Sequence, residues 1–473
     1  MRLVTRVLAT FTLASTLVAG CAGGSAGSAG AQPGSVASGA ATPAGATPPG
    51  PIRHVVLVTI DGLVPDAYLH PDIHGLQIST LRRLARDGAF SDGARSVFPS
   101  VTYPAHTSMA TGVWPARHGI YTNRAYDPGE TNQDGWRWYT EDLRAPPLWR
   151  LAEEAHYRVA LIHWPVTVGA RVTYLVPEFW RAKNDEDRKL LRALATPGLL
   201  ESVGRQHPRF WSQFTPGELK DEPLVDVGSD LLRGPAPPHL MMIHLAEVDG
   251  AQHRHGLWSR PALDAIENAD VQLARLLEAI AAAGIAVQTA LVVASDHGFA
   301  EVSQLLRPGV LLREQGLVRL DQQDRIADWR AAVNTSGGSA YVYLKDPADA
   351  EAAAAVRRSF GERAARPDGG LARVLEADQI RALGGDPGAF LALEAQPGWS
   401  LGGGYAGDLV APPPYAATHG YDPARPEMRA SLLVLAPGVP RGAIRDARLI
   451  DIAPTIANWL GLSLGDVDGR RLW

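Results

Sequence analysis

Three apolar runs in this sequence each end in residues that can bind a cation. Asp61 follows residues 54–60, Asp249 follows 240–245, and Asp296 with His297 follows 290–294. Carboxylate and neutral imidazole are suitable ligands for borderline cations such as zinc. A buried strand more often ends in a Gly or Asn turn or a solvated polar residue. Three such endings therefore indicate one shared cation site rather than three solvated loops.

Taken singly, each candidate has a simpler explanation. Asp61 before Gly62 is typical of a turn, and His419 before Gly420 is a weak signal. His253 and its neighbour His255 fit a surface loop as well as a metal site. The pair Asp296-His297 before a glycine is more specific, because both side chains can face one cavity. The chemical prediction depends on the whole set.

The elements that must position these residues alternate along the chain. Residues 54–60, 158–164, 240–245, 290–294 and 432–436 read as apolar strands. Residues 79–87, 148–156, 261–283 and 451–461 read as helices, with Ser79 as the expected cap of the first. This alternation predicts an α/β fold with a mainly parallel central sheet and helices on both faces. Ligands of such sheets bind at the carboxyl ends of the strands, where the aspartates lie.

Residues 51–473 are expected to form one catalytic domain with a small inserted subdomain. The stretch from about 300 to 425 is less regular than the rest and is rich in Gly and Pro turns. It carries its own predicted strand at 340–344. We therefore assign this stretch to an excursion or subdomain.

At this point the sequence resembles a known family. The resemblance rests on the order of Asp61, Thr102 in the segment 98–106, Asp249-x-x-x-His253, Asp296-His297-Gly298-Phe299 and His419-Gly420-Tyr421. This order looks like the alkaline phosphatase superfamily and is most similar to its type I phosphodiesterase/nucleotide pyrophosphatase branch. The resemblance covers roughly residues 52–462 and implies an alkaline phosphatase-like fold.

The resemblance implies two Zn²⁺ ions per chain. One would be held by Asp61, Asp296 and His297, with Thr102 beside it, and the other by Asp249, His253 and His419. The family spacing favours His253 over His255 as the ligand. Thr102 would be the nucleophile, so that hydrolysis passes through a phospho-threonine.

Two further residues match substrate-binding positions of the family. Asn123 matches a position whose amide donates to a phosphate oxygen, and an asparagine there also fits a turn cap. Tyr103 matches a position whose ring packs on the substrate's nucleobase, and a core tyrosine is an equal alternative. His106 and His118 are expected to support the site or the structure rather than to react.

The favoured function is hydrolysis of phosphodiester or pyrophosphate bonds in a small-molecule or nucleotide substrate. Monoesterases of the superfamily add Lys or Arg to meet an extra negative charge, and no Lys-x-Arg pair is present, although Arg117, Arg124 or Arg171 could reach the site. The alternatives are a phosphomonoesterase or phosphonate hydrolase of the same superfamily and, more distantly, a non-catalytic binding lipoprotein. The Cys/Ser-x-Pro-x-Arg arrangement of sulfatases is absent.

The N-terminal region predicts export. Residues 1–21 read as a lipoprotein signal peptide whose cleavage box ends at Cys21, the one cysteine of the chain, and an ordinary signal with an incidental cysteine is the alternative. Residues 22–50 form a Gly/Ala/Ser/Pro linker. We therefore expect an exported bacterial lipoprotein on the periplasmic side of the outer membrane, attached only through its lipid.

Composition limits the partners. The formal net charge of −5 gives no electrostatic footprint for a nucleic-acid polymer. A bound phosphate must therefore be held locally, by metal ions or backbone amides. The sequence leaves open the physiological substrate, the oligomeric state and the role of the Trp-rich loops between 124 and 235.

Overall fold

A computed structural model describes residues 46–129, 135–179, 185–215 and 218–473. The predicted signal peptide, Cys21 and most of the predicted linker lie outside these described residues. Within them, no helix combines the length and apolar character needed to cross a bilayer.

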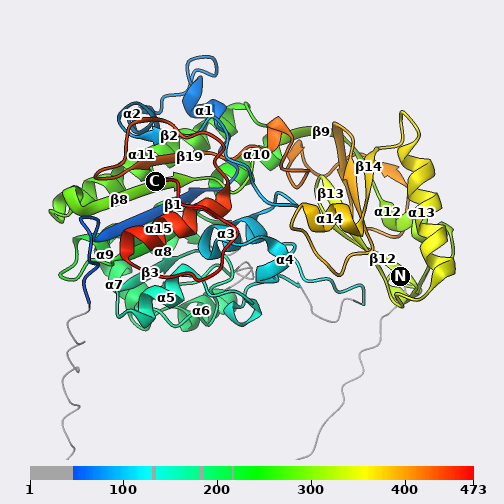
Figure 1. Ribbon diagram of the computed structural model, residues 1–473, viewed down its shortest axis with the longest axis horizontal. Helices are drawn as coiled ribbons and strands as arrows, with labels where there is room; N and C mark the ends of the chain where they lie inside the picture. The colour runs from blue at the N-terminus through cyan, green and yellow to red at the C-terminus, as the bar shows by residue number, and fades with distance from the viewer. Residues whose placement is uncertain (1–45, 130–134, 180–184, 216–217) are drawn as a thin grey trace, which may run out of the picture. The chain divides into compact units, whose positions relative to one another are not determined.

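The core element is an eight-stranded sheet with the order β20-β2-β19-β8-β1-β7-β3-β4 (Figure 1). Its strands are β1 (His54–Ile60), β2 (Ala89–Phe90), β3 (Val159–Ile162), β4 (Tyr174–Val176), β7 (Leu240–Leu245), β8 (Thr289–Ala294), β19 (Leu432–Leu435) and β20 (Gly442–Ala443). The run from β8 to β4 is parallel. Strand β19 is antiparallel to β8 and β2. The predicted α/β class with a mainly parallel sheet is confirmed.

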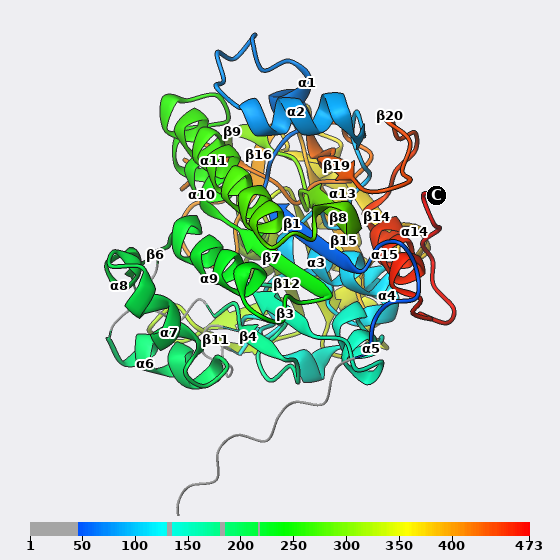
Figure 2. The same cartoon turned by 90° about the vertical axis from the view of Figure 1, so that its left-hand side faces the viewer.

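Successive side chains of β1 enter two hydrophobic clusters on opposite faces of the sheet. Val56 and Val58 pack with α2 (Ser79–Asp87), α9 (Asp221–Arg233) and α11 (Arg260–Ala282). Val55 and Leu57 pack with α3 (Thr102–Thr111), α5 (Leu148–Glu154) and α15 (Ile452–Leu460). Figure 2 shows these two helix layers on either side of β1. Burying each such side chain contributes about 1.5–3 kcal/mol, which explains the continuous apolar strand sequences.

Shorter elements connect this framework. The remaining helices before β8 are α1 (Asp66–Leu69), α4 (Pro115–His118), α6 (Asp185–Leu194), α7 (Leu199–Gln206), α8 (Phe210–Gln213) and α10 (Glu247–His255). A two-stranded hairpin consists of β5 (Phe214–Thr215) and β6 (Glu218–Leu219). Short 3-10 turns span Thr140–Asp142, Ala286–Gln288, Pro426–Met428 and Leu449–Asp451.

The region after β8 contains a second, antiparallel sheet with its own hydrophobic cluster (Figure 1). Its order is β12-β13-β15-β14, formed by β12 (Ala331–Ser336), β13 (Ser339–Leu344), β15 (Leu391–Ala395) and β14 (Leu371–Glu376). Around it lie α12 (Pro308–Glu314), β10 (Val318–Leu320), β11 (Ile326–Trp329), α13 (Ala350–Ala364) and α14 (Ala377–Ala382). The predicted strand at 340–344 falls within β13.

A third set of strands returns the chain from this sheet. Strand β9 (Ala300–Leu306) pairs with β16 (Gly398–Leu401), β17 (Val410–Ala411) and β18 (Ala417–Thr418). Thr418 of β18 lies opposite Ala300, at the start of β9. His419, the residue after β18, therefore lies near the carboxyl end of β8. Strand β9 follows β8 in the chain.

The predicted cap of α2 is wrong. The residue before the helix is Ile78, and it forms no side-chain cap. Instead, the carboxylate of Asp270 accepts hydrogen bonds from the backbone N–H groups of Thr80 and Leu81, at 3.0 and 2.6 Å. The helix is thus capped across space from α11, an arrangement that local sequence does not encode.

Gly298 follows the β8 strand end at a position with no room for a side chain. A Cβ there would overlap the carbonyl oxygen of Glu427 and approach that of Arg429. We predict that Gly298→Ala destabilises the fold by about 1–3 kcal/mol through overpacking. Gly361→Ala is the matched control, because open space surrounds Gly361 in α13. That change should stabilise the protein by about 0.5–1 kcal/mol through helix propensity.

Urea unfolding of the two variants beside the parent chain measures both effects. Equal stability of the Gly298→Ala variant and the parent would contradict the tight approach at this strand end.

Candidate metal centre and active site

The candidate ligands lie where three adjacent parallel strands end. Asp61 follows β1, and Asp296 and His297 follow β8, while Asp249 lies in the first turn of α10, just after β7. The strands are neighbours in the order β8-β1-β7. Their carboxyl ends therefore bring the three aspartates together, as the sequence pattern predicted.

The first predicted trio is compact and buried. His297 Nε2 lies 3.3 Å from Asp61 Oδ1 and 3.2 Å from Asp296 Oδ2. Asp61 is 4% exposed, and the other two side chains are fully buried. The ligand atoms of all three lie within 4.8 Å of one another, close enough for a single metal ion.

The second predicted trio adjoins the first. Asp249 and His253 are four residues apart on α10 and so share one helix face, with His253 Nε2 3.4 Å from Asp249 Oδ1. His419 Nε2 lies 3.6 Å from the same oxygen. The rings of His297 and His419 stack at 3.6 Å, so the six side chains form one continuous cluster. His297 is also close enough to share an ion with Asp249 and His419.

Backbone carbonyl groups orient the three imidazoles. His253 Nδ1 donates to Ala417 O at 2.8 Å, and His419 Nδ1 donates to Ser100 O at 3.1 Å. His297 Nδ1 donates to Gly298 O at 3.1 Å. A neutral imidazole that donates from Nδ1 carries its lone pair on Nε2, the nitrogen that faces the aspartates. The tautomer required of a metal ligand is thereby set by the fold.

Several buried atoms of the cluster have no hydrogen-bond partner within the described structure. They are Asp61 Oδ1, Asp249 Oδ1, Asp296 Oδ2 and His297 Nε2. Burial of polar atoms without partners is costly, unless a cation coordinates them. The donor set of carboxylate oxygens and imidazole nitrogens fits divalent zinc.

The electrostatics of the cluster also fit a cation. Burial, together with the charges of Asp296 and Asp249, holds the pKa of Asp61 well above its ordinary value. Burial and the neighbouring His297 and His253 hold the pKa of His419 well below its ordinary value. Burial alone would raise the pKa of Asp296, but the charges of nearby imidazoles lower it. A cluster in which carboxylates repel one another and the pKa of His419 is lowered favours a bound divalent cation.

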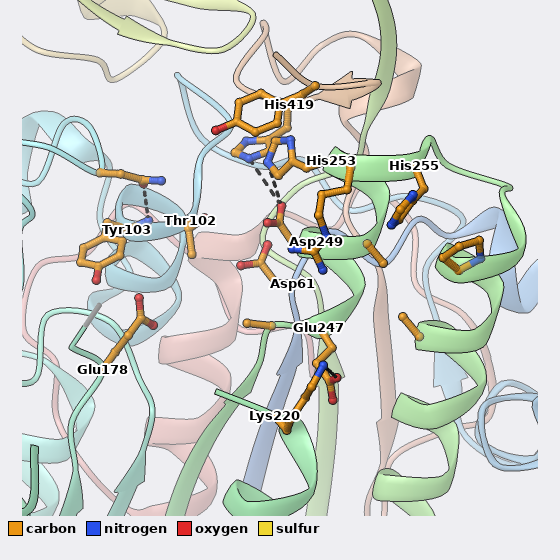
Figure 3. A pocket seen from close by; sticks show the side chains of 18 of the residues that line it. Asp61, Thr102, Tyr103, Glu178, Lys220, Glu247, Asp249, His253, His255 and His419 are labelled. Atoms are coloured by element: carbon orange, nitrogen blue, oxygen red, sulfur yellow. Dashed lines mark hydrogen bonds and ion pairs between the residues drawn. The ribbon is translucent and has the colours of Figure 1, made fainter. Parts of the chain in front are cut away.

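Thr102 lies beside this cluster. It is the first residue of α3 and is 8% exposed. Together with Asp61, Asp249, His253 and His419 it lines a cavity of about 750 Å³ (Figure 3). The positive end of the α3 dipole favours negative charge at this position. His255, the alternative to His253, lines the same cavity.

His106 and His118 support α3 from within the fold, and burial lowers the pKa of each to about 3. His106 Nδ1 donates to Thr102 O at 2.8 Å, and its Nε2 lies 2.8 Å from Thr59 Oγ1. His118 Nε2 lies 3.0 Å from Ser108 Oγ. Neither residue lines the cavity.

Asn123 also lines the cavity, and its orientation is defined. The backbone N–H of Tyr103 donates to Asn123 Oδ1 at 2.9 Å. An N–H donor requires the amide oxygen at that position. The NH₂ group of Asn123 is therefore the end left to meet a ligand.

For the ring of Tyr103 the sequence left base contact and core packing equally open, and the ring is buried in the structure. Tyr103 lines the cavity but has no exposed surface, because it packs against Trp136 at a centroid distance of 5.3 Å. Its hydroxyl group points toward Glu178 (Figure 3). The half-buried Trp136 is the aromatic ring that presents accessible surface in this part of the cavity.

Other cavity residues were not assigned from the sequence. Trp136, Trp138 and Glu178 line the cavity, and Trp138 packs on Phe179 at 4.7 Å. The Trp-rich segment was a visible signal, but its pattern did not separate a pocket wall from core packing. Beneath the cavity, His244 of β7 contacts Asp61. Its position inside an apolar strand carried no signal of chemistry.

The basic side chains around the cavity differ in part from those suggested by the sequence. Arg124 lines the cavity and lies over the Trp136 ring at 5.5 Å. Arg117 instead pairs with Asp468 at 2.9 Å. Lys220, which also lines the cavity, pairs with Glu247 at 3.0 Å.

The chain is similar to known proteins over much of its length. The family model for type I phosphodiesterase/nucleotide pyrophosphatase matches residues 55–422. Ectonucleotide pyrophosphatase/phosphodiesterase family member 1 of rat is 25% identical over 256 residues, which is 52% of this chain and 24% of the rat protein. Bovine bis(5′-adenosyl)-triphosphatase ENPP4 is 21% identical over 53% of this chain and 48% of its own length. The chain thus spans a quarter to a half of these relatives.

Solved structures share the fold. An inactive threonine-to-alanine variant of mouse ectonucleotide pyrophosphatase/phosphodiesterase 5, in complex with AMP, superposes with a TM-score of 0.62 at 20% identity. The match covers 88% of this chain and 97% of the mouse chain. The family match extends across the strand ends and Thr102, and it shows that the chain belongs to the type I phosphodiesterase/nucleotide pyrophosphatase family.

Proposed function

We propose that the protein hydrolyses phosphodiester or pyrophosphate bonds of nucleotides, with Thr102 as the nucleophile. The observation that carries this proposal is the cluster of carboxylates and imidazoles with unpartnered buried atoms, part of which lines the same cavity as Thr102 through Asp61, Asp249, His253 and His419. Membership of the nucleotide pyrophosphatase family supports it. The mouse relative was captured with AMP as an inactive threonine variant, which is consistent with a reactive threonine here.

Two zinc ions fit the donor set. Asp61, Asp296 and His297 would hold one ion. Asp249, His253 and His419 would hold the other, since both imidazoles face Asp249 Oδ1. When bound, zinc would polarise the phosphate and favour ionisation of a nearby hydroxyl group. Three protein ligands per ion leave coordination positions open, as catalysis requires.

The residues of the chain then account for the reaction. The Oγ1 of Thr102 attacks phosphorus, its proton passes through solvent to the leaving oxygen, the bond to that oxygen breaks, and a phospho-threonine forms. Water next attacks the same phosphorus and leaves its hydroxyl there, the bond to Oγ1 breaks, and Oγ1 takes up the proton that the water has lost. Because Thr102 begins α3, backbone N–H groups and the helix dipole stabilise negative charge in both steps.

Substrate orientation falls to side chains beside Thr102. The NH₂ group of Asn123 donates to a non-bridging phosphate oxygen, since its oxygen is occupied by the backbone of Tyr103. Trp136 packs on the nucleobase, while Tyr103 supports the indole from the core. Stacking accepts any base, so the base preference is weak.

The charges around the cavity favour diesters over monoesters. A monoester carries one more negative charge and needs an additional cation near the phosphate. Lys220 is paired with Glu247, and Arg124 lies over Trp136. We propose that the metal ions and Asn123 meet the phosphate, which suits a single negative charge. A phosphomonoesterase or phosphonate hydrolase is the second candidate, supported by the same metal ligands.

The setting proposed for this activity is the periplasmic side of the outer membrane. Cys21 would carry the lipid, and residues 22–50 would tether the enzyme. Labelling with a radioactive or clickable fatty acid, with Cys21→Ser as the control, tests this anchor.

Replacing the nucleophile should separate chemistry from metal binding. We expect Thr102→Ala to lower kcat/KM by about a thousandfold or more, because no other group can form the covalent intermediate. Zinc content should stay at two equivalents by elemental analysis. Thr102→Ser keeps a hydroxyl group and should retain measurable turnover. Wild-type turnover in Thr102→Ala would exclude the assigned nucleophile.

Removing the metal should weaken the fold as well as abolish activity. Without cations, the three clustered aspartates repel one another, so the chelated protein should unfold at a lower temperature, by roughly 5 °C. Calorimetry before and after chelation measures this shift, and added zinc should restore both stability and turnover. A non-catalytic binding lipoprotein predicts neither bound zinc nor a restored activity.

A substrate panel should establish the reaction class. We expect a nitrophenyl ester of thymidine 5′-phosphate to react faster than bis-nitrophenyl phosphate, and nitrophenyl phosphate to react slowest. Trp136→Ala should lower the ratio of kcat/KM for the nucleotide ester to that for bis-nitrophenyl phosphate by roughly 5- to 100-fold, the usual contribution of base stacking. The kcat/KM for bis-nitrophenyl phosphate should not change. The highest kcat/KM on the monoester would support the phosphomonoesterase alternative instead.

A further inference from the structure

One histidine outside the predicted ligand set contacts a predicted ligand directly. His244 lies on β7, and its Nε2 donates to Asp61 Oδ2 at 3.1 Å. Its Nδ1 donates to Glu178 Oε2 at 2.9 Å. His244 and Glu178 are fully buried, and Asp61 is nearly so. The imidazole thus joins the carboxylate of the metal cluster to a second carboxylate in the core.

The two oxygens of Asp61 have different surroundings. Oδ1 faces His297 Nε2 at 3.3 Å and has no hydrogen-bond partner within the described structure. Oδ2 is the oxygen that His244 holds. A carboxylate rotates about its Cβ–Cγ bond, so a donor on one oxygen fixes the direction of the other. His244 therefore directs Oδ1 toward the metal cluster.

The surroundings of His244 limit its own movement. Glu178 follows β4 and holds Nδ1. The ring of His163 is nearly parallel to that of His244, at a centroid distance of 5.6 Å, and the ring of His106 lies at 4.4 Å. A ring that is packed on its faces and hydrogen-bonded at both nitrogens has one defined orientation.

A third metal ion is the competing explanation of this cluster. Ligand atoms of His163, Glu178 and His244 lie within 4.8 Å of one another. However, each ring nitrogen of His244 already faces a carboxylate oxygen at hydrogen-bond distance. A donating nitrogen has no lone pair for a metal. The geometry therefore favours hydrogen bonding over coordination.

We propose that His244 is a positioning residue that holds Asp61 through Oδ2 and is itself held by Glu178. It raises the metal affinity of the site formed by Asp61, Asp296 and His297. Partners of metal ligands typically change metal affinity or activity by about 10- to 100-fold when they are removed. The inference rests on the proposed function, because it assumes that Asp61 binds zinc.

Two amide variants separate the two hydrogen bonds. In His244→Gln the side-chain nitrogen can occupy the place of Nε2 and still donate to Asp61. In His244→Asn the nitrogen can occupy the place of Nδ1 and still donate to Glu178. Each variant leaves one buried carboxylate without its donor, so their costs to the fold are comparable. Only His244→Asn removes the hydrogen bond to Asp61, the predicted metal ligand.

The measurement is zinc affinity of the full chain, by competition with a chromogenic chelator. We expect His244→Asn to lower the zinc affinity of one of the two sites by about 10- to 100-fold. His244→Gln should bind zinc at that site at least about tenfold more tightly than His244→Asn does. Raising the zinc concentration should restore kcat in His244→Asn, which a general folding defect would not allow. His54→Asn is the control for placing an amide side chain in the sheet, far from the metal cluster. His54 lies at the opposite end of β1, and its Nδ1 donates to Pro238 O, a bond that the asparagine amide can also make.

Other outcomes overturn the proposal in distinguishable ways. Equal losses in both His244 variants, or a greater loss in His244→Gln, would show that Asp61 is not the group that His244 positions. A third equivalent of zinc in the parent chain, lost in both variants, would favour coordination by His163, Glu178 and His244. A parent chain that binds no zinc would refute the proposed function itself.

Discussion

Mutual repulsion among three clustered carboxylates, two of them buried, is the constraint on which the rest of the site depends. Asp61, Asp249 and Asp296 are gathered because three parallel strands end at one edge of the sheet. The strands bury apolar side chains on both faces, and that burial provides the free energy that holds the charges together. Like charges in a low-dielectric interior need a counter-charge. A cation cluster is the simplest physical resolution.

The surrounding fold prepares this site without using many charged groups. Backbone carbonyl oxygens orient His253, His297 and His419, and a backbone N–H orients Asn123. Backbone groups lie within strands and turns whose positions are set by the core. Side chains held in this way lose little entropy when they bind a ligand. The preorganisation of the site is therefore a property of the strand ends.

The sequence predicted the parallel sheet, the flanking helices and the candidate ligands that follow the strands along the chain, because these features follow from local patterns. Continuous apolar runs identify β1, β7 and β8, and the predicted ligands follow within a few residues of their ends. It did not reveal partners that are distant in the chain, such as Asp270 at the start of α2. His244 was missed for the same reason, since nothing in an apolar strand indicates which side chain will contact Asp61. The accessible face of Trp136 likewise depends on packing against Tyr103.

The return of β18 to β9 has a consequence for the biogenesis of the protein. His419 is more than a hundred residues from His297, yet their rings stack because β18 pairs with the strand that follows Phe299. Contacts so distant along the chain close slowly. A newly made polypeptide would thus expose an unfinished chelating surface until the antiparallel region has folded. If the cluster binds the proposed metal, its acquisition would mark the end of maturation and would occur wherever that closure takes place.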